Sequence, residues 1–241
     1  MEWLSYLSFT GGGWGDDLLR GLGVTLALAA AALPIGLALG LAVAALALSR
    51  RVLCRGLAVG FSTTIRGLPE LLTLFIIYHW VGLGINNLLK WIDPAAAPAE
   101  LSPFLAGAIA LGLVFAGYSS EVWRGAWQAL DRGQLEAAQA IGVRRLTIFR
   151  LVELPQLVRL ALPGLGNLSI SLIKDTALVS VIALNDLMRM ANVAVGVTKK
   201  PFLFFVAVCL IYWAICLLCE CALARLERRA QRGFEREGRT A

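Results

Sequence analysis

The chain has 241 residues, of which 59% are hydrophobic, and its formal net charge is +6. Soluble domains are nearer half apolar, so this composition argues against an ordinary soluble enzyme and indicates an integral membrane protein of one domain, residues 1–241. The five cysteines lie in or beside apolar segments, which gives no indication of a disulfide framework. The basic residues cluster beside those segments, so we expect a membrane and not a nucleic acid as the partner.

Five apolar segments are long enough to cross a membrane, since a spanning helix needs about 20 residues. The first contains Gly36-x-x-x-Gly40, which is compatible with close helix packing and equally with ordinary lipid-facing glycines. Residues 56–65 are apolar but too short to span, and residues 185–200 are expected to be a loop. We place the spans at 21–49, 66–89, 101–121, 163–184 and 201–221.

The distribution of Lys and Arg predicts the orientation of these five spans. Sixteen lie in the segments 50–66, 121–159 and 225–241, whereas five lie on the opposite side of the predicted membrane. Because basic residues concentrate on the cytoplasmic side, we expect the N-terminus outside. The tail 225–241 and the polar stretch between the third and fourth spans are then cytoplasmic.

That polar stretch, 131–156, reads as two short helices separated at a glycine. Residues 134–141 are good helix formers, and Gly142 interrupts the pattern. Ala137 and Ala138 give a small-residue surface that another protein can approach closely. Glu136 is expected near the N-terminus of its helix, with its carboxylate available to an outside cation.

Pro155 is expected to stop the second of these helices, directly after Leu154. No Gly precedes a Lys anywhere in the chain, so a Walker A sequence is absent. With a single histidine, His79, a zinc HExxH site is excluded and a Ser-His-Asp triad is not expected. We predict no metal site, no cofactor and no catalytic residues in this chain.

Ionisable residues inside membrane spans are costly and indicate function. Glu70 lies where the second span begins, and Lys174 and Asp175 interrupt the fourth, next to Thr176. Adjacent helical residues do not face each other, so Lys174 and Asp175 each need another partner or a water-lined path. For Glu70, an ion pair with Arg66 at i, i+4 remains an equally good interpretation.

The order Glu136-Ala137-Ala138, three residues, Gly142, nine residues, Val152, one residue, Leu154-Pro155 resembles the EAA loop of ABC importer permeases. Further segments resemble the polar amino-acid branch of that family, so the likeness covers most of residues 20–230. It is closest to the first permease (Q-type) subunit of the histidine/lysine/arginine/ornithine and octopine/nopaline systems. The segments that carry it are 62–78, 118–125, 131–136, 161–187 and 226–229.

The resemblance implies an all-α membrane protein with five transmembrane helices and a cytoplasmic coupling helix between the third and fourth. It implies a permease subunit of a bacterial inner-membrane importer, working with a dimer of ATPase subunits that bind ATP and Mg, a sister permease and a periplasmic substrate-binding protein. Coupling to the ATPase is then expected at Glu136, Ala137, Ala138, Gly142, Leu154 and Pro155. The substrate pathway is expected at Glu70, Tyr118, Asn167, Lys174 and Thr176.

The ligand class follows from the charge at Glu70, because a carboxylate in a narrow aqueous path attracts cations. We therefore expect a basic amino acid or an opine. Some members of the family carry a polar or acidic residue after the Asn of the fourth-span motif, whereas here Leu168 follows Asn167. A self-sufficient, ion-coupled secondary transporter is the alternative, since it explains the charges in the fourth span but not the spacing of the EAA loop.

Overall fold

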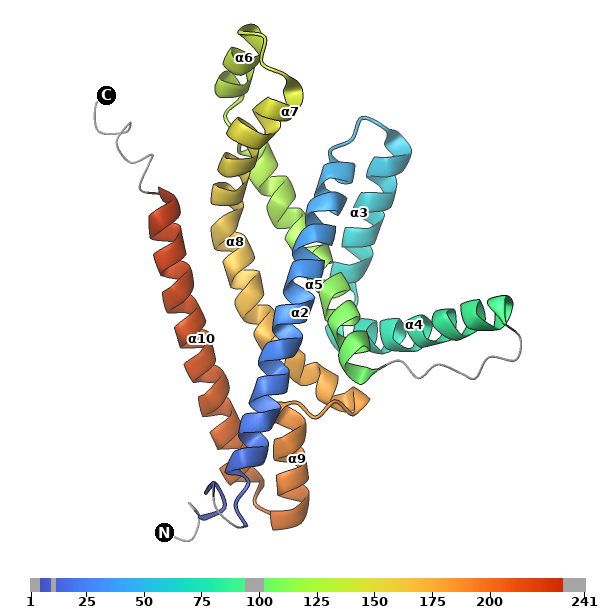
Figure 1. Ribbon diagram of the computed structural model, residues 1–241, viewed down its shortest axis with the longest axis vertical. Helices are drawn as coiled ribbons and strands as arrows, with labels where there is room; N and C mark the ends of the chain where they lie inside the picture. The colour runs from blue at the N-terminus through green and yellow to red at the C-terminus, as the bar shows by residue number, and fades with distance from the viewer. Residues whose placement is uncertain (1–4, 10–11, 94–101, 232–241) are drawn as a thin grey trace.

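The computed structural model of the chain describes residues 5–9, 12–93 and 102–231, and within these the regular structure is helical (Figure 1). Five segments are long and apolar enough to cross a membrane, which confirms the predicted all-α class with five membrane helices. The elements, in chain order, are α2 (Gly15–Ala47), α3 (Val52–Gly67), α4 (Glu70–Ile92), α5 (Pro103–Gln128), α6 (Arg132–Ala140), α7 (Arg145–Ile148), the π-helix η1 (Phe149–Glu153), α8 (Leu154–Asp175), the 3₁₀ helix η2 (Thr176–Ile182), α9 (Leu187–Thr198) and α10 (Pro201–Gln231).

The closest helix pair is α2 with α5, and glycines make this approach possible. A Cβ atom built on Gly36 would lie 2.5 Å from Cδ1 of Phe115, and one on Gly40 would lie 1.9 Å from Oγ of Ser119. The Ser119 hydroxyl donates to the carbonyl of Gly36 across the pair, with an oxygen–oxygen distance of 3.1 Å. Of the two interpretations of Gly36-x-x-x-Gly40, close helix packing is therefore correct.

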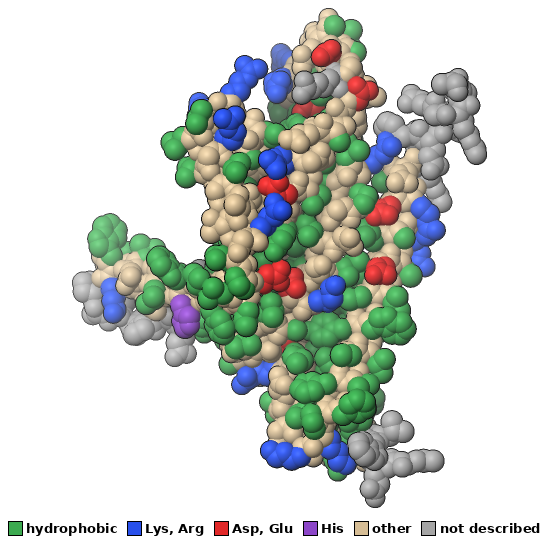
Figure 2. Space-filling model, turned by 180° about the vertical axis from the view of Figure 1, so that it is seen from behind, with side chains coloured by type: hydrophobic (Ala, Val, Ile, Leu, Met, Phe, Trp, Pro, Cys, Tyr) green, Lys and Arg blue, Asp and Glu red, His purple; other side chains and the backbone are tan. Residues whose placement is uncertain are grey.

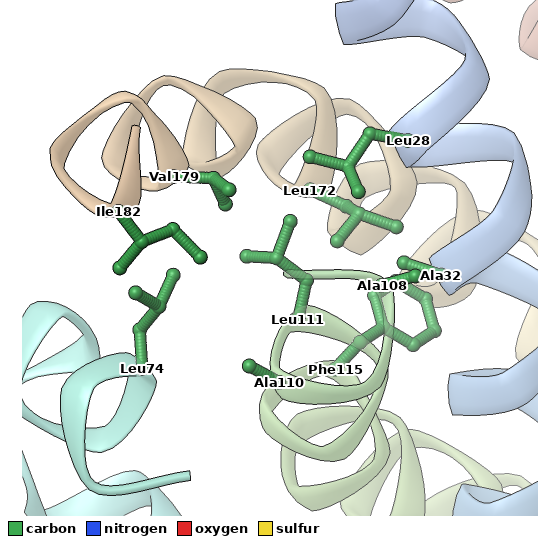
Figure 3. Close-up of a cluster of buried hydrophobic side chains, with 10 residues drawn as sticks. All are labelled: Leu28, Ala32, Leu74, Ala108, Ala110, Leu111, Phe115, Leu172, Val179 and Ile182. Atoms are coloured by element: carbon green, nitrogen blue, oxygen red, sulfur yellow. The ribbon is translucent and has the colours of Figure 1, made fainter. Parts of the chain in front are cut away.

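A buried apolar cluster joins α2, α4, α5, α8 and η2 near the middle of the molecule (Figure 3). In the close-up, Leu111 of α5 stands near its centre, with Leu28 of α2 on one side and Leu74 of α4 on the other. These contacts fix the start of α4 against α5 and α8. The members are Leu28, Ala32, Leu74, Ala108, Ala110, Leu111, Phe115, Leu172, Val179 and Ile182.

The second predicted span, 66–89, begins at a break between two helices, α3 and α4. Leu68 and Pro69 have extended backbone, since a residue before proline is pushed out of the helical region. The short apolar segment 56–65 therefore belongs to α3, and α4 leaves the bundle sideways from the break (Figure 1). This break places Glu70 at the first position of α4.

The predicted loop at 185–200 is wrong, because residues 187–198 form α9. Asp186 caps this helix: its carboxylate accepts from the backbone N–H groups of Met188 and Arg189. Leu187, Ala191 and Ala194 are buried, at the spacing of one helical face. An N-cap followed by an amphipathic period was the signal in the sequence that predicts this helix.

Pro155 does not stop a helix, contrary to the prediction. The helical path continues from α7 through η1 into α8, and Pro155 lies in the first turn of α8. Proline lacks an N–H and its ring crowds the carbonyl four residues earlier, here Leu151 in η1. The wider π turn accommodates that ring, so the helical path that contains the fourth span is continuous over Arg145–Ile182 and is longer than the predicted span 163–184.

Charge is unevenly distributed along the long axis (Figure 2). On the face shown, Lys and Arg side chains gather toward the end that carries α6 and the α2–α3 turn, whereas the middle is mainly hydrophobic. A smaller basic group lies at the opposite end. Most of the predicted loop between the second and third spans lies outside the described residues. The last ten residues of the predicted tail also lie outside them.

Candidate functional site

A small cavity of about 150 Å³ lies between α4, α5 and α8, beside the central apolar cluster. Leu111, Phe115 and Leu172 belong to both, so the apolar part of its wall is held by the packed core. Its polar part is formed by Glu70, Tyr118, Ser171 and Asp175, and its wall is completed by Val114 and Leu168. The break at Pro69 and the end of α8 at Asp175 bring these polar groups together.

The two acidic side chains of the cavity lie near each other. Glu70 and Asp175 line the same cavity of about 150 Å³ together with Tyr118, and the two carboxyl groups act on each other electrostatically. Two carboxylates this close repel each other unless a proton or another cation lies between them. The cavity is therefore electrostatically suited to a positively charged group.

Three of the predicted pathway residues do not line this cavity. Asn167 and Lys174 are on α8 but exposed, and Thr176 is fully buried with its hydroxyl donating to the carbonyl of Ile173. Of the adjacent pair, Asp175 lines this cavity and Lys174 does not. Successive residues on a helix point about 100° apart, so only one of this adjacent pair can face the cavity.

Leu168, the departure noted after Asn167, does line the cavity. It gives an apolar wall at a position where some members of the resembled family carry a polar or acidic side chain. A ligand in this cavity would therefore meet charge at Glu70 and Asp175 and an apolar surface at Leu168.

Arg66 pairs with Glu121 of α5 and not with Glu70, at 3.7 Å between Nη1 and Oε2. The same carboxylate is bound by Arg124 and accepts a hydrogen bond from the Ser62 hydroxyl at 3.2 Å. The alternative of a Glu70–Arg66 ion pair is therefore wrong, since none of the ion pairs among the described residues joins Glu70 to an arginine. Glu121 joins α3 to α5 through these contacts.

The predicted coupling loop is built around a left-handed turn. Gly142 has φ of +78°, and α6 ends with N–H groups of Gly142 and Val143 donating to the carbonyls of Gln139 and Ala138 at 3.0 and 3.3 Å. This is a Schellman motif, which favours glycine because other L-residues are strained at positive φ. Gly142 thus separates α6 from α7 as predicted.

Glu136 lies in the second turn of α6 and not near its N-terminus, where Asp131 is the cap. The helix dipole therefore acts on it less than predicted. Its side chain is exposed and borders a hollow of about 590 Å³ that Arg50, Arg145 and the buried Glu153 also line. None of the ion pairs in the described part of the chain involves Glu136.

Large apolar side chains are exposed at the tip of this loop. Ile141 is 80% exposed and Leu146 is 61% exposed, although both lie on the polar stretch between membrane segments. Ala137 is exposed as well, whereas Leu154 and Pro155 lie at the other end of the loop, in the first turn of α8. An apolar tip of this kind is typical of a protein-binding surface.

The loop is attached firmly to the membrane helices. Gln156 of α8 donates to the side-chain oxygen of Gln134 at 2.8 Å, and the rings of Trp127 and Phe149 stack at 6.2 Å. Ile148 is buried at the base of the loop. A force on α6 or α7 would therefore be transmitted to α5 and α8, the helices that line the cavity.

Residues 12–232 match the family model described as "Binding-protein-dependent transport system inner membrane component". The chain belongs to this family of ABC importer permeases. It is a permease subunit, and it is 38% identical over 239 residues to the octopine transport system permease protein OccQ of Rhizobium meliloti, covering 98% of this chain and 99% of that one. It is 33% identical to the histidine/lysine/arginine/ornithine permease protein HisQ of Escherichia coli, over 93% and 97% of the two chains.

A solved structure supports the same fold for this permease subunit. The crystal structure of an amino acid ABC transporter with histidines matches with a TM-score of 0.74 and 32% sequence identity, over 90% of this chain and 95% of that one. The family is an inner-membrane one, in agreement with the apolar helices. Among the described residues, no group of three or more His, Cys, Asp or Glu side chains is placed to hold a metal ion.

Proposed function

We propose that this permease subunit imports a cationic amino acid or an opine derived from one, and that the ligand's positive group binds between Glu70 and Asp175. The observation that carries the proposal is the pair of carboxyl groups meeting in a cavity inside the membrane segments. A low local dielectric strengthens their attraction for a cation. The names of the relatives, octopine and histidine/lysine/arginine/ornithine permeases, support the same ligand class.

Transport is driven by partner subunits in this proposal. Two ATPase subunits on the cytoplasmic side bind ATP and Mg and grip the loop from α6 to α7, while a periplasmic binding protein delivers the ligand at the opposite end. Ile141 and Leu146 supply exposed apolar anchors, and Glu136 offers a carboxylate to a basic residue of the ATPase. A sister permease completes the pathway. In this arrangement the N-terminus is periplasmic and the tail 225–241 is cytoplasmic, as the Lys and Arg distribution predicts.

The ligand assignment is tested by uptake of labelled arginine and labelled glutamate into proteoliposomes that hold the whole importer. The wild type should prefer arginine. Glu70→Gln and Asp175→Asn should each reduce arginine uptake by at least about tenfold, because removing one of two charges around a bound cation costs 2 kcal/mol or more.

Glu220→Gln is the matched control, since Glu220 is an exposed acid on α10 outside the cavity. It should transport arginine as the wild type does. A preference for glutamate, or unchanged arginine uptake in both cavity variants, would contradict the proposed role of the two carboxyl groups.

A further inference from the structure

The hollow of about 590 Å³ beside α6 has a charged, exposed rim and apolar walls. Arg50 of the α2–α3 turn, Glu136 of α6 and Arg145 of α7 are its exposed charged residues. Leu130 and Leu135 supply apolar walls. Figure 1 shows α6, α7 and the α2–α3 turn at the same end of the molecule, the end that the Lys and Arg distribution predicts to be cytoplasmic.

The buried part of the hollow carries a carboxylate without a partner. Glu153, the last residue of η1, lines the hollow and is only 7% exposed. No ion pair or side-chain hydrogen bond in the described part of the chain involves its carboxylate. Its oxygens are accessible from the hollow, because the unpartnered side-chain atoms closed to solvent among the described residues are Nε1 of Trp123 and Oη of Tyr212. A buried charge is costly unless it is paired, so Glu153 lacks a cation in this chain alone.

The walls of the hollow favour a basic side chain over a free cation. A metal ion needs several oxygen ligands, and the described residues contain no group of three or more His, Cys, Asp or Glu side chains placed to hold one. Arg50 and Arg145 would also repel a small free cation at the rim. Lys and Arg side chains instead carry their charge at the end of an apolar stem, which matches a carboxylate beside the apolar walls of Leu130 and Leu135.

The rim favours a protein that carries charges of both signs. Arg50, Glu136 and Arg145 have no ion-pair partner among the described residues. A surface with a basic residue flanked by acidic ones would be complementary to these groups and to Glu153 together. The exposed apolar side chains of Ile141 and Leu146 are on the same loop, so one partner can cover the tip of the loop and the hollow.

We propose that the hollow receives a lysine or arginine side chain of an ATPase subunit, whose cationic end binds the carboxylate of Glu153. This inference rests on the proposed contact between the ATPase and the loop from α6 to α7, and it adds a point at which the ATPase enters the permease. Glu153 directly precedes α8, which runs for 22 residues to Asp175 of the ligand cavity. A displacement of Glu153 by the bound side chain is therefore carried along a helix about 33 Å long to that cavity.

The first measurement is the affinity of the two permease subunits for the ATPase in detergent. Glu153→Gln keeps the size of the side chain and removes its charge, so the Kd should rise at least about tenfold. Glu227→Gln is the matched control, because Glu227 is a half-exposed acid on α10 outside the hollow. It should bind the ATPase as the wild type does. An unchanged Kd in Glu153→Gln would overturn the proposal.

Thermal unfolding of the permease subunits without the ATPase separates this contact from a structural role. An unpaired buried carboxylate destabilises the fold, so Glu153→Gln should unfold at the wild-type temperature or above it. A lower unfolding temperature would show that Glu153 stabilises the permease itself, and it would overturn the proposal.

Photocrosslinking identifies the occupant in the assembled importer. The photoreactive residue p-benzoylphenylalanine in place of Gln128, an exposed residue that lines the hollow, should crosslink to the ATPase. The same residue in place of Val197, on α9 at the opposite end of the molecule, should not. A crosslink from position 128 to the sister permease alone, or no crosslink, would contradict the proposed occupant.

A third position separates this proposal from the proposed function. In place of Ile141, at the exposed tip of the loop, p-benzoylphenylalanine reports the contact between the loop and the ATPase. A crosslink from position 141 but not from position 128 would leave that contact in place and contradict the hollow alone, whereas no crosslink from either would contradict both. Glu153→Gln should keep the preference for arginine over glutamate, because Glu153 lies outside the ligand cavity.

Discussion

At the scale of single residues, Glu70, Tyr118 and Asp175 form most of the polar side of the cavity between α4, α5 and α8. Glu70 and Tyr118 were predicted as pathway residues and line the cavity, whereas Asn167, Lys174 and Thr176 do not. The sequence marks the fourth span as unusual at Lys174 and Asp175, but it does not give the rotation of α8. That rotation depends on the packing of Leu172 and Val179 in the central cluster, so Asp175 could not be chosen from the pattern alone.

Gly142 is expected to be essential for coupling because of its backbone conformation. At φ of +78°, a leucine costs about 1–2 kcal/mol in the loop, yet apart from its chain neighbours no described residue lies within 4 Å of its Cβ position. Gly142→Leu should therefore remain folded in the membrane and lose at least about tenfold of its uptake. Gly142→Asn should keep more activity, because asparagine tolerates this region.

Uptake and ligand-stimulated ATP hydrolysis by the whole importer measure this effect. Gly196→Leu on α9 is the control, because Gly196 also has open space around it but lies in a helix. Normal stimulated ATP hydrolysis in Gly142→Leu would show that the turn at Gly142 does not couple the ATPase to the permease.

Asp186 gives the fold a predictable dependence on pH. Burial raises the pKa of this carboxyl group from 3.8 to about 6, against the backbone hydrogen bonds from Arg189 and Met188, which lower it. A raised pKa means that the stability contributed by the neutral form is complete below pH 4 and is lost as pH rises to 6. The loss is about 3 kcal/mol, at 1.36 kcal/mol per unit of pKa.

Asp186→Asn should remove this loss, because asparagine caps a helix as well but carries no charge. Unfolding temperatures in detergent from pH 4 to 7 should fall less steeply for Asp186→Asn than for the wild type. Relative to Asp186→Asn, Asp186→Ala should lose the cap, which costs about 1 kcal/mol at every pH because neither variant carries the charge. Parallel curves for wild type and Asp186→Asn would be inconsistent with the raised pKa.

At the scale of helices, long apolar elements were predictable and their exact limits were not. Each predicted span overlaps one apolar helical segment, because charge-free runs of about 20 residues leave few alternatives. The extension of the fourth segment through Pro155 depends on the π turn at η1, which has no clear signature in the sequence. The missed α9 is different, since Asp186 and the period of Leu187, Ala191 and Ala194 are visible in the sequence.

The α2–α5 pair should be the most sensitive helix contact to an added side chain. Gly40→Leu places its Cβ where Oγ of Ser119 lies and should lower the free energy of unfolding by about 1–3 kcal/mol. Gly23→Leu on the same helix meets open space and is the control. Thermal unfolding in detergent compares the two, and equal unfolding temperatures would argue against tight packing at Gly40.

At the scale of the whole molecule, α6 and α9 lie at opposite ends (Figure 1), and the topology inferred from the Lys and Arg distribution predicts that α6 is cytoplasmic and α9 is outside. In a variant without the five natural cysteines, a membrane-impermeant thiol reagent applied from outside should label Val197→Cys, on an exposed position of α9. It should not label Gln139→Cys, on an exposed position of α6. Labelling of Gln139→Cys from outside would reverse the topology and remove the proposed ATPase contact.

The central claim is that this permease subunit moves a cationic amino acid only under the drive of its partners. The most direct measurement is accumulation of labelled arginine in proteoliposomes. The chain should accumulate none alone, and should accumulate arginine in preference to glutamate when the ATPase, sister permease, binding protein and ATP are present. Concentrative uptake by the pure chain under an ion gradient, or a preference for glutamate by the full complex, would contradict the account.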